Sequence, residues 1–136
     1  MRDKVILGVT LSVVLLLTLL IYAAVDFQRT PAAQASAREE SIAAGKVIFA
    51  QYCVQCHGLK RNGTGVNLPG LSVRPRDHTD SKGMGDTPDD ELFKAIKEGG
   101  LAVNKSVLMP TWGKVLSDKQ ITEMVKYLRT VCHCGK

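Results

Sequence analysis

The most constraining feature of the sequence is an uncharged apolar stretch from Val5 to Val25, VILGVTLSVVLLLTLLIYAAV. An α-helix rises about 1.5 Å per residue, so this stretch is long enough to span the roughly 30 Å hydrocarbon layer of a bilayer. The alternative is a cleaved secretory signal, whose apolar region is only about 7 to 15 residues long and ends at a small-residue site. One such site begins at Ala33, well beyond the apolar stretch. The length therefore predicts a retained transmembrane anchor at residues 1–25.

The charges on either side of this stretch predict its orientation. Arg2 and Lys4 precede it and Asp26 follows it. An excess of basic residues marks the cytoplasmic side of a membrane span. We therefore expect a single-pass protein of the inner (plasma) membrane, with the remainder of the chain on the periplasmic, extracytoplasmic side.

Residues 26–35, DFQRTPAAQA, are typical of a linker because they combine Pro31 with small residues. Ser36 and Glu39 then have the spacing of a capping box, in which each side chain satisfies a free amide at a helix start. We expect the linker to end there, and a domain formed by residues 36–136 to begin with a helix.

Two more helices are predicted in this domain. One follows Thr87, with a proline and acidic residues in its first turn, and the other follows Ser117 and carries a periodic apolar stripe. Residues 58–86 are rich in glycine and have few periodic apolar positions, which predicts a long loop that wraps around a cofactor. No alternating strand pattern competes, so the predicted fold class is all-α.

The chemistry of the domain is indicated by Cys53-Val54-Gln55-Cys56-His57, a C-x-x-C-H arrangement. Two thiols on one helical turn can add to two haem vinyl groups, and this places the adjacent imidazole on the iron. The motif predicts one haem c, attached through Cys53 and Cys56, with His57 as an iron ligand. A structural disulfide or half of a zinc site are the alternatives, and a thioredoxin-like site is disfavoured by the lack of strands.

The domain resembles a class I cytochrome c, with YCVQCHG near its start and LMPTWG before a final segment containing KYLRT, in the order and separation of that family. The resemblance covers residues 36–136. It implies a cytochrome c-like, mostly α-helical domain with the haem in a cleft, His57 as proximal ligand and a downstream methionine as distal ligand. It also implies that the first and last helices cross at Gly45 and Tyr127.

Met109 is the candidate distal ligand because Pro110 favours an extended backbone, which can aim a side chain inward from a loop. A methionine and histidine pair raises the reduction potential and favours electron transfer over oxygen chemistry. Three other side chains compete for this position, and each has another explanation. Met84 is interpreted as a loop residue or haem-edge contact, Met124 as core, and His78 as an exposed turn residue.

Further site residues are implied by the resemblance. In the family a proline carbonyl after the haem motif often accepts the proton of the proximal imidazole, and Pro69 in NLPGL is the matching residue, although here proline precedes glycine. Arg74, Arg76 and Trp112 are candidates for binding or packing near the haem propionates. Solvated loop charges and a core tryptophan are the alternative explanations for these three.

Two additional cysteines, Cys132 and Cys134, flank His133 near the carboxyl end and do not form a second attachment motif. An exported location favours their oxidation, either to each other or to another chain. Metal binding with His133 is the alternative, and so is a zinc module that also uses Cys53 and Cys56.

Composition and motifs together limit the possible functions. Basic residues are scattered, the net charge is only +5, and one Trp, three Tyr and three Phe are available for stacking, so no nucleic-acid surface is indicated. No substrate pocket, general base or nucleophile is visible, which argues against an enzyme or a small-molecule substrate.

We therefore expect a membrane-anchored, mono-haem electron-transfer protein. Its partners would be membrane-embedded or membrane-associated redox proteins of a respiratory or photosynthetic chain, and it would act as a tethered carrier or as a subunit of an oxidoreductase complex. The alternative is a haem-based gas sensor or a peroxidase-like enzyme with a labile distal ligand.

Overall fold

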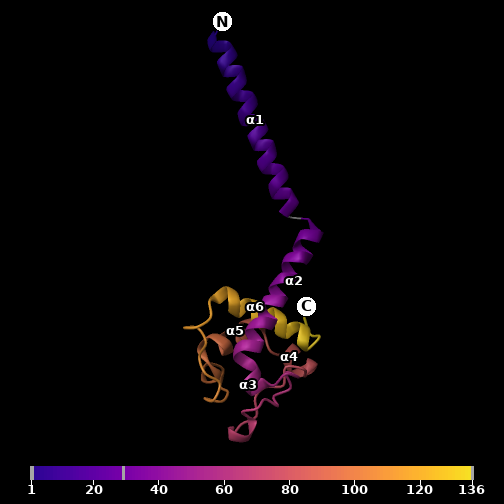
Figure 1. Ribbon diagram of the computed structural model, residues 1–136, viewed down its shortest axis with the longest axis vertical. Helices are drawn as coiled ribbons and strands as arrows, with labels where there is room; N and C mark the ends of the chain where they lie inside the picture. The colour runs from indigo at the N-terminus through magenta and orange to yellow at the C-terminus, as the bar shows by residue number, and fades with distance from the viewer. Residues whose placement is uncertain (1, 29, 136) are drawn as a thin grey trace. The chain divides into compact units, whose positions relative to one another are not determined.

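The computed structural model describes residues 2–28 and 30–135, and within these ranges all the regular elements are helical, which confirms the all-α fold class (Figure 1). The chain divides into two compact units, Met1–Arg38 and Glu39–Lys136. In chain order the elements are α1 (Arg2–Gln28), α2 (Pro31–Ile48), the π-helix η1 (Phe49–Cys53), α3 (Val54–His57), the 3₁₀-helix η2 (Leu68–Gly70), α4 (Ser81–Gly85), α5 (Asp89–Glu98), the 3₁₀-helix η3 (Gly100–Val103) and α6 (Asp118–Val131).

Helix α1 is long and apolar enough to cross a membrane, as judged by its length and composition. Its segment Thr10–Phe27 has a mean hydropathy of 2.2, and all the side chains of this segment are exposed. The hydroxyl of Ser12 donates to the carbonyl of Gly8 at 3.0 Å, and that of Thr18 donates to Leu15 at 2.8 Å. These bonds satisfy the hydroxyls within the helix itself, as a hydrocarbon environment requires.

Helix α2 begins at Pro31, so the predicted helix start at Ser36 is wrong, and most of the described part of the segment predicted to be a linker is helical. Pro31 occupies the first helical position, where a backbone N–H would have no acceptor within the helix, so proline loses no hydrogen bond there. The hydroxyl of Thr30 accepts a hydrogen bond from the amide of Ala33 at 3.3 Å, which caps the helix. The small residues after Pro31, assigned to a linker from the sequence, favour helix because alanine has the highest helix propensity.

The core of the second unit is built on α6. Ser117 and Gln120 form the predicted capping box at the start of this helix. The apolar stripe of α6 shares a buried core with the end of α2, the start of η1 and Ile96 in the last turn of α5. The residues of this core are Ile48, Phe49, Met84, Ile96, Leu116, Ile121, Met124, Val125, Tyr127, Leu128 and Cys132.

Helices α2 and α6 approach closely at Gly45, which is buried. A Cβ atom at this position would meet the backbone carbonyl of Glu123 and would lie 2.8 Å from Cβ of Tyr127. Only glycine allows the backbones to come so close. The predicted crossing of the first and last helices of the domain at Gly45 and Tyr127 is confirmed.

We expect the Gly45→Ala substitution to lower stability, although alanine has the higher helix propensity by about 1 kcal/mol. The added methyl group meets backbone rather than a movable side chain, and overpacking of this kind costs about 1–3 kcal/mol or more. Thermal unfolding of the full chain in detergent would measure the loss. Gly70→Ala is the matched control, because nothing lies within 4 Å of a Cβ at Gly70. Equal melting temperatures for the two variants would contradict a steric requirement at Gly45.

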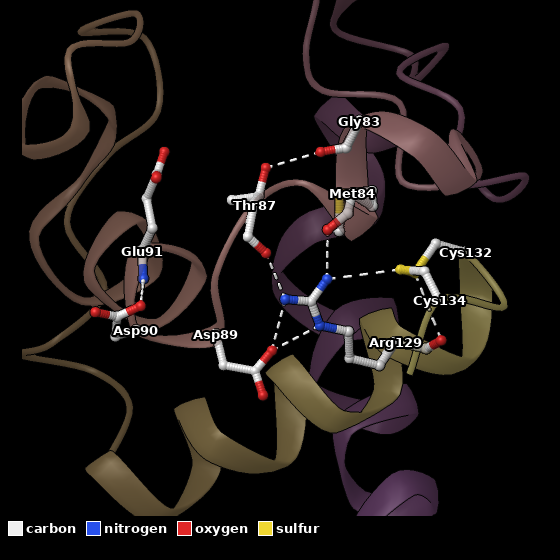
Figure 2. Close-up of polar contacts among 9 residues, drawn as sticks. All are labelled: Gly83, Met84, Thr87, Asp89, Asp90, Glu91, Arg129, Cys132 and Cys134. Atoms are coloured by element: carbon white, nitrogen blue, oxygen red, sulfur yellow. Dashed lines mark hydrogen bonds and ion pairs between the residues drawn. A yellow bond between two sulfur atoms is a disulfide. The ribbon is translucent and has the colours of Figure 1, made fainter. Parts of the chain in front are cut away.

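A second interaction ties the end of α6 to the segment that joins α4 and α5 (Figure 2). The Arg129 side chain is only 14% exposed. Its guanidinium donates to the carbonyls of Met84 and Thr87, the latter at 2.6 Å, and its Nε donates to the carboxylate of Asp89 at 2.6 Å. Figure 2 shows the planar guanidinium facing all three acceptors. One side chain thus fixes the α4–α5 turn against the last helix.

We expect Arg129→Ala to destabilise the domain by about 2–4 kcal/mol, because it removes the donor to the Thr87 carbonyl, one of two donors to the Met84 carbonyl, and a charge-assisted bond to Asp89. Chemical denaturation, followed by circular dichroism, would measure this change. Lys82→Ala is the control: Lys82 forms an exposed ion pair with Asp86, and removing it should leave the unfolding midpoint in place. An Arg129→Ala protein that is as stable as the control would rule out this role.

Candidate functional site

The C-x-x-C-H segment lies at the end of an almost unbroken helical run formed by α2, η1 and α3. Cys53 ends the π-helix, and Cys56 and His57 lie on the following short α-helix. Single π-helical turns inside α-helices are frequent at functional sites. Gly58 then stops the helix with φ = +80°, a conformation that favours glycine, while its amide donates to the carbonyl of Val54 at 2.8 Å. The segment is therefore fixed by regular structure before it and by a glycine turn after it.

One ring nitrogen of the half-buried His57 forms a hydrogen bond. Nδ1 lies 3.1 Å from the backbone carbonyl oxygen of Arg76. A carbonyl oxygen only accepts, so Nδ1 carries the proton and donates it, which leaves Nε2 as the nitrogen able to bind a metal. Burial lowers the pKa of His57, while the bond to Arg76 opposes this change. The imidazole is thus favoured in its neutral, metal-binding form.

The sequence-based assignment of this acceptor to Pro69 is wrong. Pro69 lies in η2, whereas the carbonyl that accepts from His57 belongs to Arg76, further along the same loop. The exchanged order of proline and glycine in NLPGL was a signal against Pro69. Nothing local in the sequence marks Arg76, since a backbone carbonyl is available in any residue and its direction depends on the path of the loop.

Cys53 and Cys56 are unpaired and half-buried. Burial, and to a smaller degree the neighbouring Cys56, raises the pKa of the Cys53 thiol to about 12. The side-chain Nδ2 of Asn67 donates to Sγ of Cys56 at 3.7 Å. Both thiols are therefore free to be modified, and Cys53 stays protonated at neutral pH.

His78 is not the exposed turn residue that the sequence predicted. It is only 8% exposed, and its ring stacks on that of His57 with centroids 4.3 Å apart and planes inclined by 17°. The amide of His78 donates to the carbonyl of Arg61 at 2.8 Å, which draws the segment against the end of α3. Burial lowers the pKa of His78 to about 3, so its ring is neutral. The polar sequence Arg-Asp-His-Thr gave no signal of this contact.

The segment that carries Met109 lies beside the C-x-x-C-H segment. Met109 is half-buried against the core, and its carbonyl accepts from the amide of Gly100 at 3.0 Å. Trp112 follows it, and the Trp112 ring lies 5.5 Å from the ring of Tyr52, which directly precedes Cys53. The structure thus brings the two predicted ligand segments together through an aromatic pair. Ligation by Met109 itself stays a prediction.

The competing methionines lie in the core. Met84 is fully buried on α4, so its interpretation as a loop residue or haem-edge contact is wrong. Met124 is buried on α6, as predicted. Within residues 2–28 and 30–135, Met109 is thus the one methionine whose side chain is partly exposed. A fully buried thioether is committed to packing, which favours Met109 over the other two.

The two arginines lie on the surface of the loop. The guanidinium of Arg74 lies 3.5 Å from the carbonyl of Asn62, and the Arg76 guanidinium lies near Gly83. Trp112 is half-buried and packs against the core. Roles for Arg74, Arg76 and Trp112 at haem propionates stay predictions.

Cys132 and Cys134 form a disulfide with each other, which confirms the first of the sequence-based hypotheses for them. The bond removes two of the four cysteines that a zinc module would need. Moreover, the described part of the chain holds no group of three or more potential ligands from His, Cys, Asp and Glu. The four cysteines of the zinc alternative are therefore not gathered into one site among the described residues.

We expect mass spectrometry to detect this disulfide in the purified protein. Trypsin cleaves after Arg129, and the next basic residue is Lys136, so the released peptide is residues 130–136. Before reduction its mass should be lower by two hydrogens than after reduction, and it should resist alkylation. After reduction the same peptide should take up two alkyl groups. A Cys134→Ser protein provides the control, because its peptide should react once without reduction. A wild-type peptide that is alkylated without reduction would contradict the disulfide.

The donor set fits a covalently attached haem. It offers a neutral imidazole with Nε2 free, two unpaired thiols that precede it, and a partly exposed thioether on a neighbouring segment. Histidine and methionine are together a known axial pair for haem iron, and the spacing of the thiols matches that of the attachment motif.

Comparison with known proteins agrees with this chemistry. The profile of a family described as cytochrome c oxidase, cbb3-type, subunit III, matches residues 40–128, which is more than half of the chain. A direct comparison with curated proteins gave no match. The match covers the C-x-x-C-H segment, the Met109 segment and most of α6.

Proposed function

The chain belongs to the family of cytochrome c oxidase, cbb3-type, subunit III, a mono-haem cytochrome c family that carries out electron transfer, and we propose that it is a membrane-anchored carrier of single electrons. Within the proposal it serves a respiratory or photosynthetic chain, as a subunit of an oxidoreductase complex or as a tethered carrier. Its partners are other redox proteins in or on the same membrane.

Four residues hold the haem in this proposal. Cys53 and Cys56 form the two thioether bonds, His57 binds through Nε2, and Met109 provides the second axial ligand. The observation that carries the proposal is the bond between His57 Nδ1 and the Arg76 carbonyl, because it selects the tautomer in which Nε2 is free. When bound, haem c supplies a metal centre that is reversibly oxidised and reduced by one electron. The protein positions the ligands and limits access of water to them.

The membrane anchor in the proposal is α1. Its exposed apolar side chains and its internally bonded hydroxyls suit a lipid environment. Arg2 and Lys4 favour a cytoplasmic amino terminus, so the haem domain is exported to the other side. An anchor keeps the local concentration of the domain high near membrane-embedded partners.

A visible difference spectrum of membranes that contain the full chain tests this function. We expect the wild type to show low-spin c-type bands when reduced, and a haem-stained band that remains after denaturing electrophoresis and stays with the membrane pellet. Met109→Ala should keep the covalent haem but lose or shift the low-spin bands, because one axial ligand is gone. Cys56→Ala should lower haem attachment.

Leu108→Ala is the matched control, since it changes the neighbouring, more exposed residue of the same segment. Its spectrum should equal that of the wild type. A wild type without covalent haem would disprove the proposal. A wild-type ferrous protein that binds carbon monoxide readily would support the gas-sensor alternative, because a firmly bound distal ligand excludes that molecule.

A further inference from the structure

We propose that His78 is a positioning residue for the iron ligand His57, on which its ring stacks, and that it sets the orientation and the solvent access of that imidazole. This inference rests on the proposed haem-binding function. It concerns a residue that the attachment motif does not include, and a contact that the sequence does not predict.

Two backbone bonds bring the residues together. The Arg76 carbonyl accepts from Nδ1 of His57 at 3.1 Å, and two residues later the His78 amide donates to the Arg61 carbonyl at 2.8 Å. The segment 76–78 is therefore anchored twice to residues 57–61. This double anchor leaves the His78 ring facing the His57 ring, with centroids 4.3 Å apart and planes inclined by 17°.

Packing, rather than a hydrogen bond from its ring, holds His78 in this position. Its Nδ1 is buried and has no hydrogen-bond partner. The ring of Phe49 approaches it edge-on, with centroids 5.9 Å apart at 74°. Burying an unpaired ring nitrogen is unfavourable. An apolar side chain of similar size would therefore cost less free energy at this position. The property that His78 provides to its neighbour is therefore a flat ring.

The same geometry excludes His78 as the distal ligand in this arrangement. If His57 and His78 were both to hold one haem iron, the group would have to fit between them. The rings of His57 and His78 instead lie face to face, with no room for a macrocycle between them. His78 would thus support His57 as its neighbour and would not itself hold the iron.

A stacked ring acts on the ligand in two ways. The bond from Nδ1 to Arg76 restrains the tilt of the His57 ring, and the stack restrains its rotation about the bond that joins the ring to Cβ. The ring of His78 also keeps water away from one face of the imidazole. Outer-shell contacts of this kind orient metal ligands and, by controlling solvent access, tune the reduction potential.

The test compares His78→Ala and His78→Phe in the full-length, haem-containing membrane protein. His78→Phe keeps a flat ring and removes both ring nitrogens. Covalent haem content, the electron paramagnetic resonance g values of the ferric form and the midpoint potential are measured for each. His133→Ala is the control, because His133 is exposed and lies between the disulfide cysteines.

We expect all the variants to contain covalent haem. His78→Ala should shift the g values, because the imidazole plane is less restrained, and lower the midpoint potential, because water stabilises the oxidised iron. His78→Phe should restore both to wild-type values, and His133→Ala should leave both unchanged. A role limited to stability would change the melting temperature of His78→Ala without moving the g values.

Three results would overturn the inference while leaving electron transfer by the haem domain intact, and the third would also overturn Met109 as the distal ligand. The first is a haem-containing His78→Ala protein with wild-type g values and potential. The second is a His78→Phe protein that shows the same shifts as His78→Ala, so that the flat ring is not what matters. The third is loss of the low-spin spectrum in both variants, which would make His78 a ligand. Absence of covalent haem in the wild type would instead disprove the proposed function, and this inference with it.

Discussion

The close crossing of α2 and α6 at Gly45 is the constraint on which the position of the C-x-x-C-H segment depends. Helix α2 continues through the π-helix η1 into α3, so the positions of Cys53, Cys56 and His57 follow from the place where α2 meets α6. Phe49 is buried where α2 passes into the π-helix, against the core that α6 supplies. A side chain at Gly45 would push the helices apart and would move the whole C-x-x-C-H segment relative to the core.

The long loop after this segment has little core of its own and is held from its two ends. At the start, the bonds from His57 to Arg76 and from His78 to Arg61 fold the loop back on α3. At the end, Arg129 binds the turn between α4 and α5. The middle of the loop carries exposed apolar residues, Val66 and Val73. The bonds to Arg76 and from His78 thus hold the loop against the segment that carries His57.

The elements that could be predicted from the sequence are those with local signals. The apolar composition of α1, the capping box of α6 and the C-x-x-C-H spacing each depend on residues that lie close together in the chain. The features that were predicted wrongly depend on contacts between residues far apart in the sequence. The acceptor at Arg76 and the burial of His78 follow from the path of a loop, which no local pattern encodes. The start of α2 is different: Thr30 and Pro31 were a local signal, and the capping-box pattern at Ser36 competed with it.

The two proposed iron ligands are restrained in different ways, and this difference bears on how the site would respond to its surroundings. The His57 ring is fixed by a helix, by a hydrogen bond at Nδ1 and by the stack with His78. The backbone of Met109 is fixed by Gly100, whose amide donates to the Met109 carbonyl, while its unbranched side chain is held by packing alone. A thioether held by packing yields more easily than a bonded, stacked imidazole. A change of ligand would therefore begin on the Met109 side, and the proximal side would keep its geometry.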